Sequence, residues 1–405
     1  METDSVFDGI KVLDFTWAAA GPLVTKHLAD FGATVVKLES ANRPDVMRVG
    51  SPYKDNIAGL DRSGMYIIFN ANKYGISLNL NHPKGIDIAK RLVSWCDIVA
   101  ENFTPGTLER WGLEYENLKK IKPDIIMIRS SMEGSSGPRV GRRLTGHQGV
   151  GLAGFSHLTG FPDRDPSQPF AAYTDYVGPR FMITALISAL DYRRRTGKGQ
   201  CMEVSQYEAS LHFLSPAILD YTVNGRETDR AGNSCPHAAP HSTYRCQGDD
   251  RWCAITVFTD KEWAAFCKAI GNPKWTTDPR FATLLSRKSN EDALNRLVEE
   301  WTMQFPAEEV MQRLQAAGVA AGVVRTTADL HDDSPVWEQG QLWSLKHAEV
   351  GPTVHLGQGV RLSQTPAKAQ RPAPCIGQDS EYVMTQILGI TTEEFAELLN
   401  EGVFD

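Results

Sequence analysis

The stretch GIKVLDFTWAAAGPLVTKHLADFGATVVKLES, residues 9–40, decides the fold. Its segments KVLDF and TVVKLE are short apolar runs of the kind that form buried strands. Between them, a turn of small residues precedes a helix that we expect from about Leu23 to Phe31. Strand, helix and strand in this order predict a βαβ unit, which places the two strands parallel in one sheet.

The same alternation continues further along the chain. Residues 81–96 have the helical spacing of apolar residues and lead into DIVAENF, and PDIIMIRSS at 123–131 again places a buried strand after a helix. We therefore predict an α/β fold with a mostly parallel sheet covered by helices. A long helix is expected across Arg180–Arg195, because the glycine-containing turn TGKGQ follows it.

The chain has 405 residues. A single hydrophobic core usually stops growing at roughly 250–300 residues, so we expect two domains. A polar stretch rich in Gly, Pro and His begins near Asn224, and a new strand follows it. We predict that 1–223 begins a large Rossmann-like domain and that 224–325 forms a smaller α+β domain. An amphipathic helix near the end indicates that 326–405 returns to the large domain.

Composition excludes several classes of protein. The net charge of −7 argues against a nucleic-acid partner, because phosphate binding needs a concentrated basic face. No apolar run is long enough to cross a membrane, and the first residues lack the pattern of a secretory signal. Seven scattered cysteines indicate reduced thiols. We therefore expect a soluble, cytoplasmic protein.

The first βα turn is where a dinucleotide-binding protein would carry the pattern GxGxxG. Here the turn has alanines at 18–20, followed by Gly21 and Pro22. Their side chains limit how closely the backbone can approach a pyrophosphate. The sequence therefore disfavours nicotinamide dinucleotide binding in the usual mode.

Several segments together resemble the class III coenzyme A-transferases of the CaiB/BaiF type. Besides residues 9–40, they are NANKYGISLNL, ENFTPGTLERWGL, PDIIMIRSS, TGKGQCMEVSQYEA, GVAAGVV and PCIGQDSEYVMTQILG, in family order. The resemblance implies a large Rossmann-like domain built from the N- and C-terminal segments, a smaller domain between them, and two protomers interlinked like rings. It also implies transfer of coenzyme A from an acyl-CoA donor, such as succinyl-CoA, to an organic acid. Coenzyme A is then a substrate, and no tightly bound cofactor is expected.

Asp175, in PFAAYTDYVGPRFM, matches the position of the family's catalytic aspartate. A carboxylate with an ordinary pKa of about 3.9 is ionised at neutral pH and can attack a thioester without a general base. The product would be an aspartyl-acyl anhydride and a free thiolate. The alternative is that Asp175 only caps a helix that begins near Val177.

Coenzyme A carries a diphosphate and a ribose phosphate, which call for basic side chains. The resemblance indicates six contact residues, although each basic one taken singly is more often a solvated surface charge. They are Lys73, Asn102, Arg110, Arg142, Arg143 and, on a looser match, Arg48.

His147, in TGHQGVGLAG, matches the acid/base histidine of the acyl-CoA racemases in this superfamily. A histidine and an aspartate on opposite sides of an α-carbon can exchange its proton. An acyl-CoA racemase or epimerase that uses His147 and Asp175 is therefore the second hypothesis. The third is a non-catalytic partner subunit of a heteromeric CoA-transferase, against which the presence of Asp175 argues.

The strings YTDYVGPRFM and GNSCPHAAPHSTYRC are most similar to the benzylsuccinate CoA-transferase branch. That similarity implies an aryl-substituted dicarboxylate acceptor in anaerobic aromatic degradation, and either a homodimer or a heteromer with a homologous subunit. The formyl-transferring branch differs from this chain. It has a glycine-rich loop at GNSCPHAAPHS and a glutamine at Ala19, so its oxyanion contacts are not transferred.

Cys235, His237, His241 and Cys246 are residue types that bind zinc. Their spacing contains neither CxxC nor a helical HxxxH, because Pro240 intervenes. We therefore predict no metal site.

Overall fold

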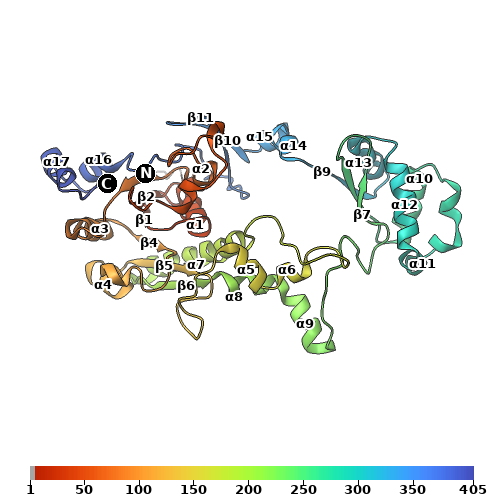
Figure 1. Cartoon of the computed structure of the whole chain (residues 1–405), viewed down its shortest axis with the longest axis horizontal. Helices are drawn as coiled ribbons and strands as arrows, with labels where there is room; N and C mark the ends of the chain where they lie inside the picture. The colour runs from red at the N-terminus through yellow and green to blue at the C-terminus, as the bar shows by residue number, and fades with distance from the viewer. Residues whose placement is uncertain (1–4) are drawn as a thin grey trace. The chain divides into compact units, whose positions relative to one another are not determined.

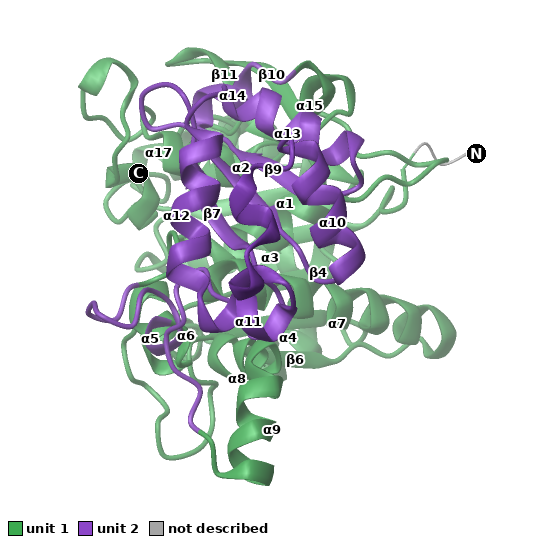
Figure 2. Ribbon diagram, turned by 90° about the vertical axis from the view of Figure 1, so that its right-hand side faces the viewer, with its two compact units in different colours: residues 1–155, 168–226, 334–405 green, residues 156–167, 227–333 purple. Residues whose placement is uncertain are grey.

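The structure, a computed structural model, describes residues 5–405 and divides into two compact units. Figure 2 shows unit 1, which comprises residues up to 155, 168–226 and 334–405, and unit 2, which comprises 156–167 and 227–333. The sequence placed the changes of domain at 224 and 326. It gave no sign that the short segment 156–167 would join the second unit.

Unit 1 contains a sheet of six parallel strands in the order β3-β2-β1-β4-β5-β6. The strands are β1 (Lys11–Asp14), β2 (Thr34–Glu39), β3 (Tyr74–Ser77), β4 (Ile98–Glu101), β5 (Ile126–Ser131) and β6 (Cys201–Ser205). The order reverses between β1 and β4, so the chain winds outward in both directions from this pair, as in a Rossmann fold. The predicted α/β class with a mostly parallel sheet is confirmed.

Consecutive residues of the central strands face opposite sides of the sheet, because side chains alternate along a strand. Val12, Val35 and Ile98 pack on the face covered by α1 (Ala20–Asp30) and α7 (Thr174–Thr196). Their neighbours Leu13, Val36 and Val99 pack on the face covered by α3 (Pro83–Trp95) and α4 (Tyr115–Ile121). Both faces are therefore covered, which explains why these strands contain consecutive apolar residues.

Unit 1 contains further α-helices and two further strands. They are α2 (Gly64–Asn70), α5 (Gly146–Leu152), α8 (Gln206–Leu211), α9 (Ser215–Asn224), α15 (Ser334–Glu338), α16 (Ser380–Tyr382), α17 (Thr392–Asn400) and the antiparallel pair β10 (Leu342–His347) and β11 (Gly351–Leu356). One of these helices, α9, projects away from the sheet (Figure 1). The late segment returns to the sheet, since Gly75 donates its N–H to Asp379 at 2.8 Å. Beyond α17, Val403 and Phe404 pack into the core on the α3 face.

The helix α7 differs from the sequence prediction. The sequence analysis placed its start at Arg180 or, for the capping alternative, near Val177, but it begins at Thr174 and contains Pro179. Proline has no N–H, so the hydrogen bond that residue 179 would donate to the carbonyl of Asp175 cannot form. Packing of Val177, Pro179 and Met182 against the interior nevertheless keeps this turn helical.

Unit 2 has its own hydrophobic core. An antiparallel sheet in the order β7-β8-β9 packs against helices through Tyr244, Ile255 and Phe266. Its elements are β7 (His241–Arg245), β8 (Trp252–Thr256), β9 (Ala320–Val324), α10 (Asp260–Ala269), α11 (Leu284–Ser289), α12 (Glu291–Thr302), α13 (Ala307–Ala316) and α14 (Thr327–His331). The short helix α6 (Phe155–Leu158) begins at the last residue of the preceding unit 1 segment.

Within residues 5–405, no helix is both long enough and apolar enough to cross a membrane.

Candidate functional site

A cavity of about 410 Å³ opens at the carboxyl ends of the central strands of unit 1. Its lining comes from the end of β2, from the loops that follow β1, β2, β3 and β4, and from one residue of the longer connection after β5. The residues are Phe15, Trp17, Ala18, Leu38, Glu39, Ser40, Arg43, Leu78, Asn79, Leu80, Asn81, Asn102, Phe103, Thr104, Thr107, Arg110, Trp111 and Arg143. The cavity thus includes the point between β1 and β4 where the strand order reverses. Open parallel sheets bind their ligands at this point.

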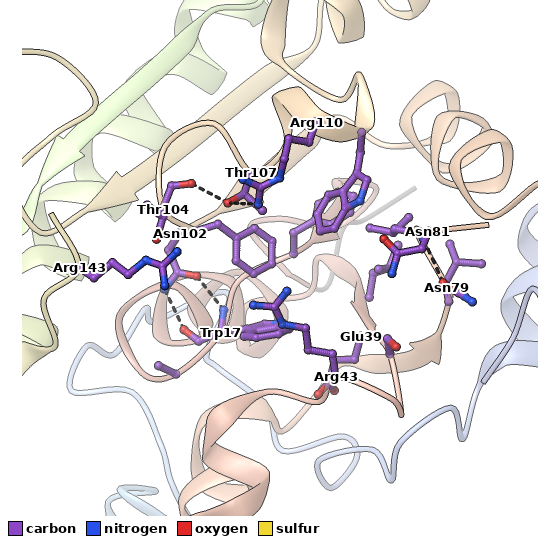
Figure 3. A pocket seen from close by; sticks show the side chains of 18 residues that line it. Trp17, Glu39, Arg43, Asn79, Asn81, Asn102, Thr104, Thr107, Arg110 and Arg143 are labelled. Atoms are coloured by element: carbon purple, nitrogen blue, oxygen red, sulfur yellow. Dashed lines mark hydrogen bonds between the residues drawn. The ribbon is translucent and has the colours of Figure 1, made fainter. Parts of the chain in front are cut away.

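Two loops of the cavity are joined by a reciprocal pair of hydrogen bonds (Figure 3). The Trp17 N–H donates to Oδ1 of Asn102 at 2.7 Å, and Nδ2 of Asn102 donates to the Trp17 carbonyl at 2.8 Å. Asn102 was predicted as a ligand of coenzyme A, and it lines the cavity. Its amide oxygen and one amide N–H, however, hold the loop after β1 in place.

The cavity combines aromatic faces with arginines. Trp17 and Phe103 make an edge-to-face contact at 5.2 Å between ring centroids, and the Arg43 guanidinium lies 6.0 Å from the Trp17 ring. Arg110 and Arg143 also line the cavity. Among the described residues, none of these three guanidinium groups forms an ion pair. The cavity is therefore suited to a ligand that is both anionic and aromatic.

Two of the predicted coenzyme A ligands lie elsewhere, in the buried interior. Arg48 makes a two-bond fork with Glu39, at 2.8 Å for each bond, and pairs with Asp61 at 2.6 Å. Lys73 donates to Asp14 at 3.0 Å, to Asn70 at 2.8 Å and to a backbone carbonyl. Ligand contact would require both side chains to leave these partners, so we assign them to the support beneath the cavity.

Burial explains the electrostatics of this support. Desolvation lowers the pKa of Lys73 to about 8, although the Asp14 carboxylate opposes the change. For Glu39, the cations Lys37 and Arg48 outweigh desolvation and hold the pKa at about 2. Arg142, also predicted as a ligand, is exposed, lies 3.9 Å from Glu133 and does not line the cavity.

Arg43 and the aromatic residues were missed by the sequence analysis. Arg43 follows the end of β2 by four residues, and Trp17 and Phe103 follow the ends of β1 and β4. All three therefore lie in the loops where a parallel sheet presents its ligand contacts. Their position just after predicted strands is the sequence signal that indicates ligand contact. The family resemblance alone did not identify them.

Asp175 lies in the first turn of α7 and is partly buried. No side-chain hydrogen bond caps this helix, whose N-cap is Tyr173, so the capping role considered for Asp175 is wrong. Desolvation raises the pKa of Asp175 to about 6, and the charge of His147 acts in the opposite direction. Among the described residues, the Asp175 carboxylate has no ion pair and no side-chain hydrogen bond.

A glycine allows α5 to approach this carboxylate. A Cβ atom at Gly146 would lie 2.5 Å from Oδ2 of Asp175, a distance that real contacts do not reach. The hydroxyl of Thr174 also donates to the Gly146 carbonyl at 3.3 Å. The start of α5 is therefore fixed against the start of α7, with Asp175 between them.

His147, the next residue of α5, is exposed and held in one orientation. Its Nδ1 lies 2.9 Å from Oε1 of Gln168, and Nε2 of Gln168 donates to the His147 carbonyl at 3.1 Å. Because the Gln168 amide nitrogen donates to this carbonyl, the Gln168 amide oxygen is the atom that faces the imidazole. An amide oxygen can only accept, so Nδ1 of His147 carries the proton. Nε2 of His147 is then left as the basic nitrogen.

The residues considered for zinc do not form a ligand set. Nδ1 of His241 lies 2.6 Å from the carbonyl of Asn233, and the thiol of Cys246 lies buried beside the Tyr244 carbonyl. Over residues 5–405, no group of three or more His, Cys, Asp or Glu side chains is placed to hold a metal ion.

Comparison with known proteins gives matches over most of the chain. A family model described as CoA-transferase family III matches residues 7–380. Succinyl-CoA–D-citramalate CoA-transferase of Chloroflexus aurantiacus is 32% identical over 391 residues, covering 96% of this chain and 96% of that protein. The beta subunit of succinyl-CoA–L-malate CoA-transferase from the same organism is 29% identical and covers 98% of this chain and 97% of its own length.

The fold is also found among solved structures. The crystal structure of a CaiB/BaiF family protein from Brucella suis has 29% sequence identity and a TM-score of 0.87. The match covers 95% of this chain and 100% of that one. The similarity therefore includes both units.

Proposed function

Because the chain belongs to CoA-transferase family III and is a CoA-transferase, we propose that Asp175 attacks the thioester of an acyl-CoA donor. The observation that supports this most is the partly buried Asp175 carboxylate without a charged partner. With a pKa of about 6, it is largely ionised at neutral pH. Burial also removes part of the water that would otherwise surround the nucleophile.

The proposed reaction conserves an activated acyl group at every step. An Asp175 oxygen attacks the thioester carbon, the carbon–sulfur bond breaks, and an aspartyl-acyl anhydride and a thiolate form. The thiolate then attacks the Asp175 carbonyl, which releases the donor acid and leaves coenzyme A on the enzyme. The acceptor carboxylate displaces the thiolate to form a second anhydride, and the thiolate takes the acceptor's acyl group. No other cofactor is required.

We place the nucleotide of coenzyme A in the cavity at the strand ends. Arg43, Arg110 and Arg143 supply guanidinium forks suited to phosphate oxygens. The rings of Trp17 and Phe103 supply faces and edges for a heteroaromatic base.

The donor we propose is succinyl-CoA, because relatives at 32% and 29% identity are named for it. The same names include citramalate and malate, whereas the resemblance of the sequence alone favours benzylsuccinate as the acceptor. A panel of these acids, each incubated with succinyl-CoA, identifies the acceptor by mass spectrometry of the thioester formed.

Hydroxylamine trapping tests the covalent mechanism. Hydroxylamine added during turnover should convert the activated carbonyl of Asp175 to a hydroxamate, and peptide mass spectrometry should place the modification on this residue. The reaction should require both enzyme and acyl-CoA. An inactivated enzyme with an unmodified Asp175 peptide would contradict the anhydride.

We expect transfer to depend on pH through Asp175. Below its pKa of about 6, the carboxyl group is protonated and cannot attack the thioester, so kcat/KM should fall about tenfold per pH unit. Above that value the rate should reach a plateau. Initial rates across the acid range, with the stability of the enzyme checked at each pH, measure this profile. A plateau that continues unchanged below about pH 5 would contradict an essential carboxylate with this pKa.

An acyl-CoA racemase activity is the second candidate, and the influence of His147 on the pKa of Asp175 favours it. Nε2 of His147 is available as a base, as deduced from its bond to Gln168. Exchange of solvent deuterium into the α-position of an acyl-CoA, without any acceptor acid, would identify this activity.

We propose that the chain works as two interlinked protomers in the cytoplasm. The helix α9 supports the assembly, because Leu219, Tyr221 and Val223 are exposed on it and none of its residues is buried within the single chain. One relative is a subunit of a named alpha and beta pair, so the partner is either a second copy or a homologous chain. Light scattering of the purified chain measures its mass in solution: a dimer indicates a second copy as the partner, and a monomer indicates a homologous chain.

A further inference from the structure

The carboxylate of Asp405 is the centre of a hydrogen-bond cluster beside the cavity. It accepts from the hydroxyl of Ser40 at 2.6 Å, the N–H of Ala41 at 3.1 Å, the amide of Asn42 at 2.8 Å and the hydroxyl of Ser77 at 2.7 Å. Desolvation raises the pKa of Asp405, but the donors outweigh it and hold the pKa below its usual value. The group is therefore an anion at neutral pH.

The three residues at 40–42 connect β2 to Arg43. Ser40 and Arg43 both line the cavity, and the N–H of Arg43 donates to the Ser40 carbonyl at 3.1 Å to close the turn. Figure 3 shows the guanidinium of Arg43 over Trp17, on the wall formed by this turn. Two side chains fix this turn to the rest of unit 1. Asp405 accepts from Ser40, Ala41 and Asn42, and the Ser77 hydroxyl, itself bonded to Asp405, accepts from the Ala41 N–H at 3.0 Å.

The position of Asp405 is itself set by the core. Val403 is fully buried, and the ring of Phe404 lies 5.0 Å from that of Phe395 in α17. The carbonyl of Val403 also accepts from the N–H of Asn79 at 2.9 Å, and Asn79 lines the cavity after β3. Residues 403–405 therefore connect the hydrophobic core to two of the loops that form the cavity.

We propose that Asp405 is a positioning residue that holds Arg43 for the anionic nucleotide of the acyl-CoA substrate. The proposal rests on the proposed function, in which this cavity binds that nucleotide. Asp405 does not line the cavity, so it acts through the turn and not by contact with the ligand. Its loss changes how tightly acyl-CoA binds and leaves the attack by Asp175 unchanged.

A purely structural role for Asp405 makes different predictions. If the cluster only stabilised the fold, its loss would lower thermal stability and affect all substrates alike. If it positions Arg43, the effect is confined to donors that carry the nucleotide. Acyl-pantetheine, which has the thioester but lacks the nucleotide, separates the two roles.

The experiment compares Asp405→Ala, Arg43→Gln and the double variant with the wild-type chain. We expect each single variant to raise the KM for succinyl-CoA about tenfold with kcat within about twofold, as for the loss of one charge-assisted hydrogen-bond network. The double variant should be no worse than Arg43→Gln, because residues that act through each other are not additive. With succinyl-pantetheine, Asp405→Ala and wild type should have equal kcat/KM.

Glu401→Gln is the matched control. Glu401 lies in the same segment but pairs with Lys84 at the surface, so its loss should leave the KM unchanged. A raised KM in Arg43→Gln with a normal KM in Asp405→Ala would overturn the positioning role and leave the proposed cavity function intact. Equal losses with succinyl-CoA and succinyl-pantetheine would overturn it in favour of a structural role. Normal KM values in both variants would overturn the positioning role and the nucleotide site together.

Discussion

Asp175→Asn is expected to abolish coenzyme A transfer and to leave the fold intact. The amide has the shape of the carboxyl group but no ionised oxygen to attack a thioester, so neither anhydride can form. Loss of a covalent nucleophile commonly lowers kcat by a factor on the order of 10⁴ or more. The measurement is the rate of succinyl-CoA consumption with a saturating acceptor acid, together with the circular dichroism spectrum of the variant.

The same substitution should make the protein more stable. The pKa of Asp175 is about 6 in the folded chain, above its unfolded value of about 3.9, so the folded state binds more protons between these values. Stability contributed by this group therefore falls as the pH rises through that window and stays low at neutral pH. Allowing for partial exposure, the ionised carboxylate costs about 1–2 kcal/mol, which Asp175→Asn removes.

Asp191→Asn provides the control for both measurements. Asp191 lies on the same helix, is half-buried, and pairs with Arg194 and Arg195 at the surface. Its substitution should change neither transfer nor the melting temperature by more than a small amount. Near-normal turnover in Asp175→Asn would exclude the nucleophile, whereas inactivity with a lowered melting temperature would indicate a structural role.

The four central strands of the parallel sheet, β2, β1, β4 and β5, could be predicted because their apolar runs are buried on both faces, whereas the edge strands β3 and β6 were not predicted. Val12 and Leu13 face opposite sides of the sheet, and both sides are buried. Each of these strands therefore contains a run of consecutive apolar residues that can be recognised in the sequence. The same reasoning placed the first helix within three residues of its observed start, Ala20.

The start of α7 could not be predicted in this way. The sequence analysis placed its start at Arg180 from the turn that ends the helix, and Pro179 is a local signal against a helix interior. Tertiary packing of Val177 and Met182 prevails over that local preference. As a consequence Asp175, which the sequence placed before the helix, lies within its first turn.

For the basic residues, the sequence does not show which side chains line the cavity and which are buried. Arg43 and Arg48 are five positions apart, yet Arg43 lines the cavity and Arg48 is fully buried. Asp45 separates them: its carboxylate accepts from the N–H of Met47 and begins the short 3₁₀ turn Val46–Val49, which directs Arg48 inward. The resemblance matched a basic residue in this loop but could not tell whether its side chain points into the cavity or into the protein interior.

Arg48→Ala is expected to lower the stability of the protein strongly, in contrast to the effect of a lost ligand contact. The variant leaves Glu39 buried without its fork partner, and removing one member of a buried ion pair typically costs about 3–5 kcal/mol. The face of the Tyr66 ring, 3.5 Å from the guanidinium, also loses its packing partner. Urea denaturation followed by fluorescence measures the change.

Arg43→Ala is the matched comparison, since it removes the same side chain from the same loop but from the cavity wall. It should raise the KM for acyl-CoA and leave the midpoint of urea denaturation close to that of the wild type. The two variants should therefore have opposite effects. Arg48→Ala should lower stability, and Arg43→Ala should weaken substrate binding. Wild-type stability in Arg48→Ala, combined with a raised KM, would show that the buried fork opens to reach the substrate, because only a guanidinium that leaves Glu39 can contact the nucleotide.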